Sequence, residues 1–218
     1  MSTDDQPVSA QRPAVHPIEA ESFRILEARV DLSGWAPQER AVVARVIHAT
    51  ADESFAATMR VGARAVSGAS VALQEGAAVI CDARMVVAGI ASGLGPSHAP
   101  LCLLDEVPVA APGDTRSAAA MRLAADRHPD GAVFVIGNAP TALAALLDLH
   151  ADGRVRPAAV IGLPVGYVGA LEAKARLWDS PLAPIAVTNL DRRGGSPAAA
   201  AAFNAIARLA RPLPAGGS

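Results

Sequence analysis

The sequence has few cysteines, few lysines and few aromatic side chains. It holds two cysteines and a single lysine, Lys174, and aromatic residues make up 3% of it. Cys81 and Cys102 are too few for a disulfide framework or a structural zinc site, so we expect both to be packing residues in a reducing compartment. The histidines show neither paired spacing nor carboxylate neighbours at metal-ligand spacing, so we expect no metal centre.

Long apolar runs and an excess of basic charge are also absent. No apolar stretch reaches the roughly 18 residues that a membrane-spanning helix needs. The formal net charge of -2 argues against nucleic acid as a partner. Residues 1–17 are polar, carry prolines and have no signal-peptide core, so we expect a disordered tail there. These features predict a cytoplasmic protein with a single domain over residues 18–212.

Short β-branched runs alternate with longer helical patterns from about residue 78 onward. This alternation predicts an α/β fold with a mainly parallel sheet flanked by helices, because parallel strands that are covered on both faces are apolar throughout. The expected strands are 77–81, 132–137, 158–164 and 184–188, with 99–104 as a weaker candidate. The expected helices are 115–128, 139–150, 167–178 and 195–209, preceded by an N-terminal helical portion at 20–30 and 36–75.

Five loops are expected at the ligand-binding edge of this sheet. Ligands of open parallel sheets bind beyond the carboxyl ends of the strands, where the chain turns into a helix. Arginines and hydroxyl groups are concentrated in these turns, at 82–85, 113–117, 137–141, 162–166 and 192–196. Guanidinium groups bind carboxylates in pairs of hydrogen bonds, so the loops together fit a ligand with many carboxylates. Taken singly, each arginine better suits a solvated surface position, and only their concentration at this edge favours binding.

Other common chemistries lack their motifs. The turn at 137–141 resembles a phosphate-binding loop, but no G-x-G-x-x-G follows the first strand and no G-x-x-x-x-G-K-[ST] occurs. No G-x-S-x-G nucleophile motif occurs either. A nucleotide-dependent α/β enzyme therefore stays open only as a less favoured alternative.

Segments in a recognisable order run along the chain from about residue 18 to 207. They are 18–26, 45–52, CDARMVVAGI (81–90), GDTRSAAA (113–120), IGNAPTAL (136–143), GLPVGYVGALEAK (162–174) and RRGGS (192–196). By these segments the chain resembles the precorrin-8X methylmutase family, or precorrin isomerases, of cobalamin biosynthesis. Because the match is spread over most of the chain, it is far more specific than any one of its segments.

The resemblance implies an isomerase that moves a methyl group from C-11 to C-12 of a corrinoid ring. The product would be hydrogenobyrinic acid, or cobyrinic acid where the substrate already holds cobalt. The resemblance also implies a parallel sheet flanked by helices, a homodimer with active sites at the subunit interface, and no separate cofactor. The substrate is a large apolar macrocycle rimmed by carboxylates, which is the kind of ligand that the arginine-rich loops fit.

The resemblance assigns catalysis to His48, which occupies the position of the family's histidine. A histidine can protonate the ring or a neighbouring atom because histidines titrate near neutrality. Taken by itself, His48 better suits a partly buried helix position, and the resemblance reverses this preference. Thr50 and Asp52 either orient the histidine or cap a helix. The substrate-binding residues that the resemblance implies are Ser22, Arg116, Ser117, Asn138, Thr141, Lys174 and Ser196, with Arg116 and Lys174 on peripheral carboxylates.

Three positions depart from the family pattern. Ala173 stands where the family commonly has a serine, Ala91 where some members have a threonine, and Glu19 where some have an aromatic residue. These departures keep open a second alternative, a corrinoid-binding carrier without turnover. Both the metal-free and the cobalt-containing corrinoid suit the motifs.

Overall fold

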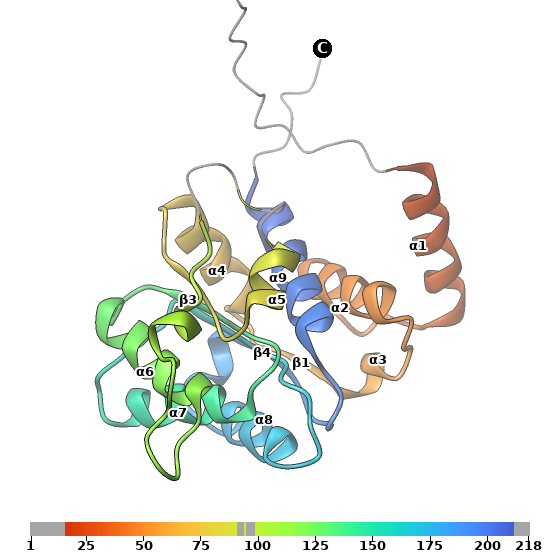
Figure 1. The fold of residues 1–218 in the computed structure, drawn as a ribbon. Coiled ribbons are helices and arrows are strands. Elements are labelled where there is room, and N and C mark those ends of the chain that lie inside the picture. The colour runs from red at the N-terminus through yellow and green to blue at the C-terminus, as the bar shows by residue number, and fades with distance from the viewer. Residues whose placement is uncertain (1–15, 91–93, 95–98, 212–218) are drawn as a thin grey trace, which may run out of the picture.

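The computed structural model describes residues 16–90, 94 and 99–211, which form a five-stranded sheet between two layers of helices (Figure 1). The strands are β1 (Met59–Val61), β2 (Val79–Cys81), β3 (Val133–Ile136), β4 (Ala159–Gly162) and β5 (Ala186–Asn189), in the order β1-β5-β4-β3-β2. The strands β2 to β5 run parallel, and β1 pairs with β5 in the antiparallel sense. The predicted α/β class with a mainly parallel sheet is confirmed.

Helices cover both faces of the sheet (Figure 1). The first face carries α2 (Pro37–Thr50), α4 (Ala65–Gln74), α5 (Arg84–Ile90) and α9 (Ser196–Ala210), and the second carries α6 (Arg116–Arg127), α7 (Pro140–Ala151) and α8 (Ala170–Trp178). The remaining elements of the described chain are α1 (Pro17–Arg29), α3 (Phe55–Thr58) and the 3-10 helices η2 (Leu103–Glu106) and η3 (Ala183–Ile185). None of the helices in the described ranges is long and apolar enough to cross a membrane.

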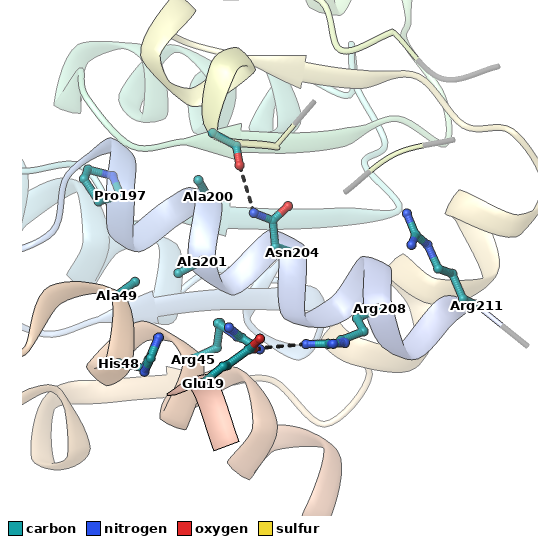
Figure 2. A pocket seen from close by; sticks show the side chains of 11 residues that line it. Glu19, Arg45, His48, Ala49, Pro197, Ala200, Ala201, Asn204, Arg208 and Arg211 are labelled. Atoms are coloured by element: carbon teal, nitrogen blue, oxygen red, sulfur yellow. Dashed lines mark hydrogen bonds and ion pairs between the residues drawn. The ribbon is translucent and has the colours of Figure 1, made fainter. Parts of the chain in front are cut away.

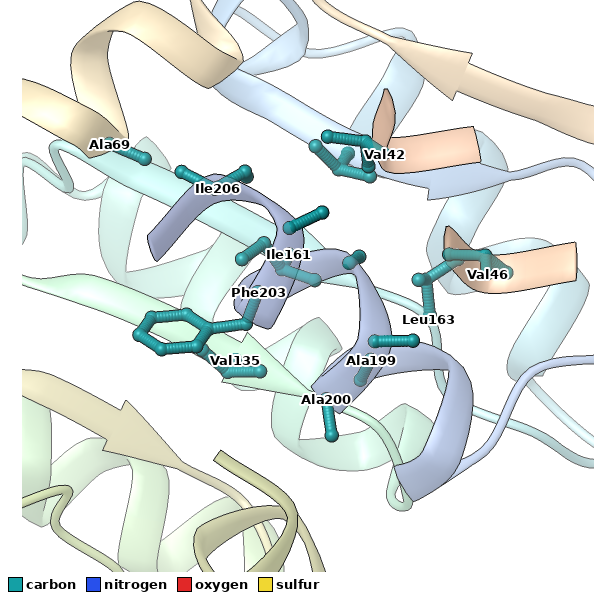
Figure 3. Packing of buried hydrophobic residues seen from close by; sticks show 14 of the residues in the cluster. Val42, Val46, Ala69, Val135, Ile161, Leu163, Ala199, Ala200, Phe203 and Ile206 are labelled. Atoms are coloured by element: carbon teal, nitrogen blue, oxygen red, sulfur yellow. The ribbon is translucent and has the colours of Figure 1, made fainter. Parts of the chain in front are cut away.

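The core is divided in two because neighbouring residues of each strand point to opposite faces. Val133 and Val135 belong to the cluster under α9, whereas Phe134 and Ile136 belong to the cluster under α6 and α7. Phe203 of α9 is fully buried in the first cluster (Figure 3). The helix α9 is buried along almost its whole length, because α2, α4 and α5 pack against it in addition to the sheet.

Two segments differ from the structure that the sequence predicts. Within the expected helical portion at 36–75, residues 59–61 form the edge strand β1, whose burial alternates around Arg60. Three residues are too few for alternation to be told from a helical pattern. The weaker strand candidate at 99–104 is a single bridge between Leu101 and Ile80, followed by η2. The expected tail at 1–17 lies outside the described residues, except for 16 and 17.

Candidate active site

His48 lies in the last turn of α2 and lines a cavity of about 510 Å³. The cavity lies over α9, between α2 on one side and α5 on the other (Figure 2). Small side chains leave this space open, and polar and charged side chains surround it. Its lining residues are Glu19, Arg45, His48, Ala49, Gly89, Pro197, Ala200, Ala201, Asn204, Arg208 and Arg211.

The position of His48 follows from the way α2 is built. Pro37 occupies the first turn, where a missing N–H costs nothing, and Val42, Val43 and Val46 bury the apolar side of the helix. His48 falls beside this buried side and is half-buried. The helix ends at Ala51, which is in the left-handed conformation with a φ of 51°.

Thr50 and Asp52 stabilise the end of α2. The Thr50 hydroxyl donates to the Val46 carbonyl at 2.8 Å, and the Asp52 carboxylate pairs with the Arg193 guanidinium at 3.0 Å. The contacts of these two residues therefore favour the helix-capping interpretation over a direct contact with His48.

Two neighbouring residues of α1 contact the His48 ring. The Ser22 hydroxyl oxygen lies 3.0 Å from His48 Nδ1, and the Phe23 ring stacks on the imidazole with centroids 4.7 Å apart and planes inclined by 13°. The Arg45 guanidinium lies over the same Phe23 ring, 4.7 Å from its centroid. The predicted residues Ser22 and His48, which are 26 positions apart in the sequence, are thus in direct contact.

Glu19, one of the departures from the family pattern, joins two arginines on the cavity wall. Its carboxylate lies 2.6 Å from the Arg45 guanidinium and 3.2 Å from that of Arg208 (Figure 2). The hydrogen bond from Arg45 is the main cause that lowers the pKa of Glu19, and Arg208 adds to it. With Arg211, the wall carries three guanidinium groups against one carboxylate, which favours an anionic ligand.

A second group of predicted residues lies at the starts of α6 and α7, on the other side of the sheet from α2. The Arg116 guanidinium donates to the carbonyls of Val107 and Leu104, each at 2.7 Å. The Thr141 hydroxyl lies 2.8 Å from that of Thr115. Ser117 is in the first turn of α6, and the side chain of Asn138 is exposed next to the start of α7.

Asp82 holds the turn before α7 in place, and the sequence did not single it out. Its buried carboxylate accepts hydrogen bonds from the backbone N–H groups of Gly137, Asn138 and Ala139 at 3.0, 2.8 and 2.6 Å. Burial is the main cause that raises the pKa of Asp82, and the three N–H donors oppose it. The donors that made this turn resemble a phosphate loop are therefore occupied by a carboxylate of the chain itself. The one signal was its position directly after a strand.

Lys174 and Ser196 are both buried, away from the lining of the His48 cavity. The Lys174 ammonium donates to Asn189 Oδ1 at 2.9 Å and to the Arg193 carbonyl at 2.6 Å. Burial lowers the pKa of Lys174 to about 8. Ser196 begins α9 close to the turn of Asp82, since a Cβ at Gly137 would lie 2.9 Å from Ser196 Cα. Lys174 therefore holds the loop after β5, and Ser196 is packed at the start of α9.

Comparison with known proteins identifies the family. A sequence model described as "Precorrin-8X methylmutase" matches residues 17–209. The chain belongs to the precorrin-8X methylmutase family. It is similar to a precorrin-8X methylmutase of Pseudomonas aeruginosa, with 41% identity over 86% of this chain and 92% of the relative. It is also similar to a cobalt-precorrin-8 methylmutase of Synechocystis, with 36% identity over 91% of this chain and 97% of the relative.

The fold agrees with this family assignment. A crystal structure of a precorrin-8X methylmutase from Thermus thermophilus matches with a TM-score of 0.77 and 40% identity, over 89% of this chain and 98% of that one. The resemblance that the motifs carried is therefore confirmed, and the chain is an isomerase of cobalamin biosynthesis. Of the other departures from the precorrin-8X methylmutase pattern, Ala173 is buried next to Lys174 on α8, and Ala91 lies outside the described residues.

Proposed function

We propose that this member of the precorrin-8X methylmutase family moves a methyl group from C-11 to C-12 of precorrin-8X and so forms hydrogenobyrinic acid. Cobalt-precorrin-8, which would give cobyrinic acid, is the alternative substrate, since relatives named for either compound match the chain. The observation that carries the proposal is a histidine in a family-matched segment, lining a cavity with an excess of arginines.

His48 acts as a general acid in this proposal. Protonation of a ring nitrogen or a neighbouring atom withdraws electrons from the conjugated macrocycle, so the methyl group migrates with its bonding pair to C-12. Substrate and product of an isomerisation contain the same atoms, so the proton that His48 donates is recovered at the end of the reaction. The half-buried position of His48 supports this role, because the side chain reaches the cavity while α1 shields its other side.

The arginines recognise the carboxylate side chains of the corrinoid. Arg45 and Arg208 both contact Glu19, and the Arg45 guanidinium can bind a second carboxylate through its remaining N–H groups. The cavity volume of about 510 Å³ falls in the range of small-molecule sites, roughly 300–1,000 Å³. A corrinoid with its carboxylate arms extends beyond it, so further contacts come from outside this cavity.

A second copy of the chain supplies those contacts in the homodimer that we propose. Ser22 and His48 lie on the α2 side of the sheet, whereas Arg116, Asn138 and Thr141 lie at the starts of α6 and α7. Exposed apolar side chains lie in the segments that follow β2 and β4 and precede α6: Met85, Val109, Val165, Tyr167 and Val168. Apolar side chains gathered at one edge suit burial against a partner or a ligand. Lys174 would support this surface through the loop that it holds, and Ser196 through its buried position at the start of α9.

Turnover of the wild-type protein tests this function and separates it from the carrier alternative. The full-length protein is incubated with precorrin-8X, and the absorption spectrum is followed for the change to hydrogenobyrinic acid. Multiple turnovers are expected. Tight binding of the corrinoid without conversion would support the carrier, and neither binding nor conversion, with cobalt-precorrin-8 inactive as well, would overturn the proposal.

A further inference from the structure

We propose that Ser22 and Phe23 of α1 are positioning residues that fix the His48 ring so that Nε2 presents its proton to the cavity. The inference rests on the proposed role of His48 as the acid. It adds a residue, Phe23, to which the resemblance assigns no role, and it gives Ser22 a role that acts through the histidine.

The hydroxyl of Ser22 selects the nitrogen that faces the substrate. Because Ser22 Oγ lies 3.0 Å from Nδ1, that nitrogen is engaged within the protein and Nε2 is the one left for a ligand. A hydroxyl can donate to Nδ1 of the neutral ring and accept from Nδ1–H of the cation. Ser22 therefore stays hydrogen-bonded to His48 in every state. Its hydroxyl donates to Nδ1 in the neutral Nε2–H tautomer, and it accepts from Nδ1–H both before and after the imidazolium gives its Nε2 proton to the substrate.

The ring of Phe23 fixes the plane of the imidazole. The two rings are nearly parallel, with an inclination of 13° and a centroid separation of 4.7 Å. A stack of this kind resists tilting of the imidazole, and the hydrogen bond to Ser22 resists its rotation within the plane. The two contacts together leave the ring one orientation.

A cation–π contact, supported by an ion pair, holds Phe23 in place. The Arg45 guanidinium lies 4.7 Å from the Phe23 centroid, and Arg45 is tied to Glu19 at 2.6 Å. Leu26 is the only residue of α1 that is buried, so this helix contributes little to the core. Three of its residues, Glu19, Ser22 and Phe23, nevertheless contact His48 or Arg45. The structure thus points to α1 as the element that orients the acid.

Variants of the full-length protein test this inference through kinetics and NMR. In Phe23→Leu, which keeps the apolar volume but loses the stack, kcat is expected to fall roughly tenfold while KM changes less than about twofold.

In Ser22→Ala, the ¹⁵N signals of His48, assigned by their loss in His48→Ala, are expected to shift from the Nε2–H tautomer to a mixture. Ile25→Ala, at an exposed position of the same helix, is the matched control and should leave kcat and the His48 signals unchanged.

The results of these experiments can be told apart from the result of the turnover test of the proposed function. The NMR signals need no substrate, so they report on positioning even if the wild type does not convert precorrin-8X. Phe23→Tyr keeps the ring and is expected to retain wild-type kcat, which guards against a folding defect in Phe23→Leu. The inference is overturned by unchanged kcat in Phe23→Leu together with unchanged tautomer signals in Ser22→Ala. It is also overturned if Phe23→Leu raises KM with kcat intact, because Phe23 would then contact the substrate directly.

Discussion

Asp82 and Lys174, two buried ionisable residues, each hold a loop at the carboxyl edge of the sheet. The Asp82 carboxylate accepts hydrogen bonds from the N–H groups before α7, and the Lys174 ammonium donates hydrogen bonds to the side chain of Asn189 and the carbonyl of Arg193. Sequence motifs predicted Lys174 as a substrate-binding residue but gave no sign that its charge is used within the chain. Burial of a charge depends on contacts between distant segments, which a single sequence does not display.

The pH dependence of stability tests the burial of Lys174. Its pKa is lowered from 10.5 to about 8 in the folded chain, so between these values the unfolded chain binds more protons. The free energy of unfolding that depends on Lys174 should therefore rise as the pH increases from about 8 to 10.5. Urea unfolding of the wild type and of Lys174→Met at pH 7.5 and 9.5 measures it. Equal slopes with pH in the two proteins would show that the ammonium is solvated.

Replacement of Asp82 tests the turn before α7. In Asp82→Asn the side-chain amide can place its NH₂ group against backbone N–H donors, which leaves them unsatisfied, so the free energy of unfolding should fall by about 1–3 kcal/mol. Asp126→Asn, at an exposed ion pair with Arg154, is the control and should change it by less than about 0.5 kcal/mol. Equal effects of the two substitutions in urea unfolding would contradict the assignment of Asp82.

At the scale of the elements, the short apolar runs and the helical periodicity predicted most of the strands and helices. The helices α6, α7, α8 and α9 begin within three residues of their expected starts, and β2 to β5 fall within the expected strands, apart from the last residue of β5. The strand β1 was missed because its pairing with β5 comes from the sheet and not from its own three residues. The contact between α1 and His48 could likewise not be predicted from the sequence, since it joins two helices whose relative placement no motif encodes.

Close packing between the turn at Gly137 and the start of α9 is testable by adding one methyl group. A Cβ at Gly137 would lie 2.8 Å from Ala199 Cβ and 2.9 Å from Ser196 Cα, so Gly137→Ala should lower the free energy of unfolding by about 1–3 kcal/mol. At Gly34 nothing lies within 4 Å, and Gly34→Ala serves as the control with a change under about 0.5 kcal/mol. If thermal unfolding shows the two variants equally stable, α9 does not pack as closely as described.

At the scale of the whole molecule, the fold separates two groups of polar residues that the family motifs place in one site. The sequence predicted Ser22 and His48 in the first group and all the named members of the second, but none of the arginines of the His48 cavity. No spacing in a sequence tells whether two groups meet within one chain or between two. The His48 cavity and the starts of α6 and α7 lie on different sides of the sheet (Figure 1). The proposed homodimer would bring the two groups together across an interface.

Mixing two inactive variants tests the shared site. One carries His48→Ala, and the other carries Asn138→Asp with Thr141→Asp, which repels substrate carboxylates. After subunit exchange, half of the dimers are mixed and each has one intact site of two, so activity at low substrate should return to about a quarter of the wild type. Sedimentation velocity checks that dimers form. No recovery of activity in mixed dimers would place the whole site within one chain.

The most direct test of the central claim is a single-turnover measurement of precorrin-8X conversion by the wild type and by His48→Ala. Binding of the corrinoid is followed by fluorescence quenching of the tryptophans and conversion by absorbance. We predict that His48→Ala binds with an affinity within a few-fold of the wild type and converts the substrate at least about 100-fold more slowly, because it lacks the acid. Conversion by His48→Ala at the wild-type rate would contradict the account.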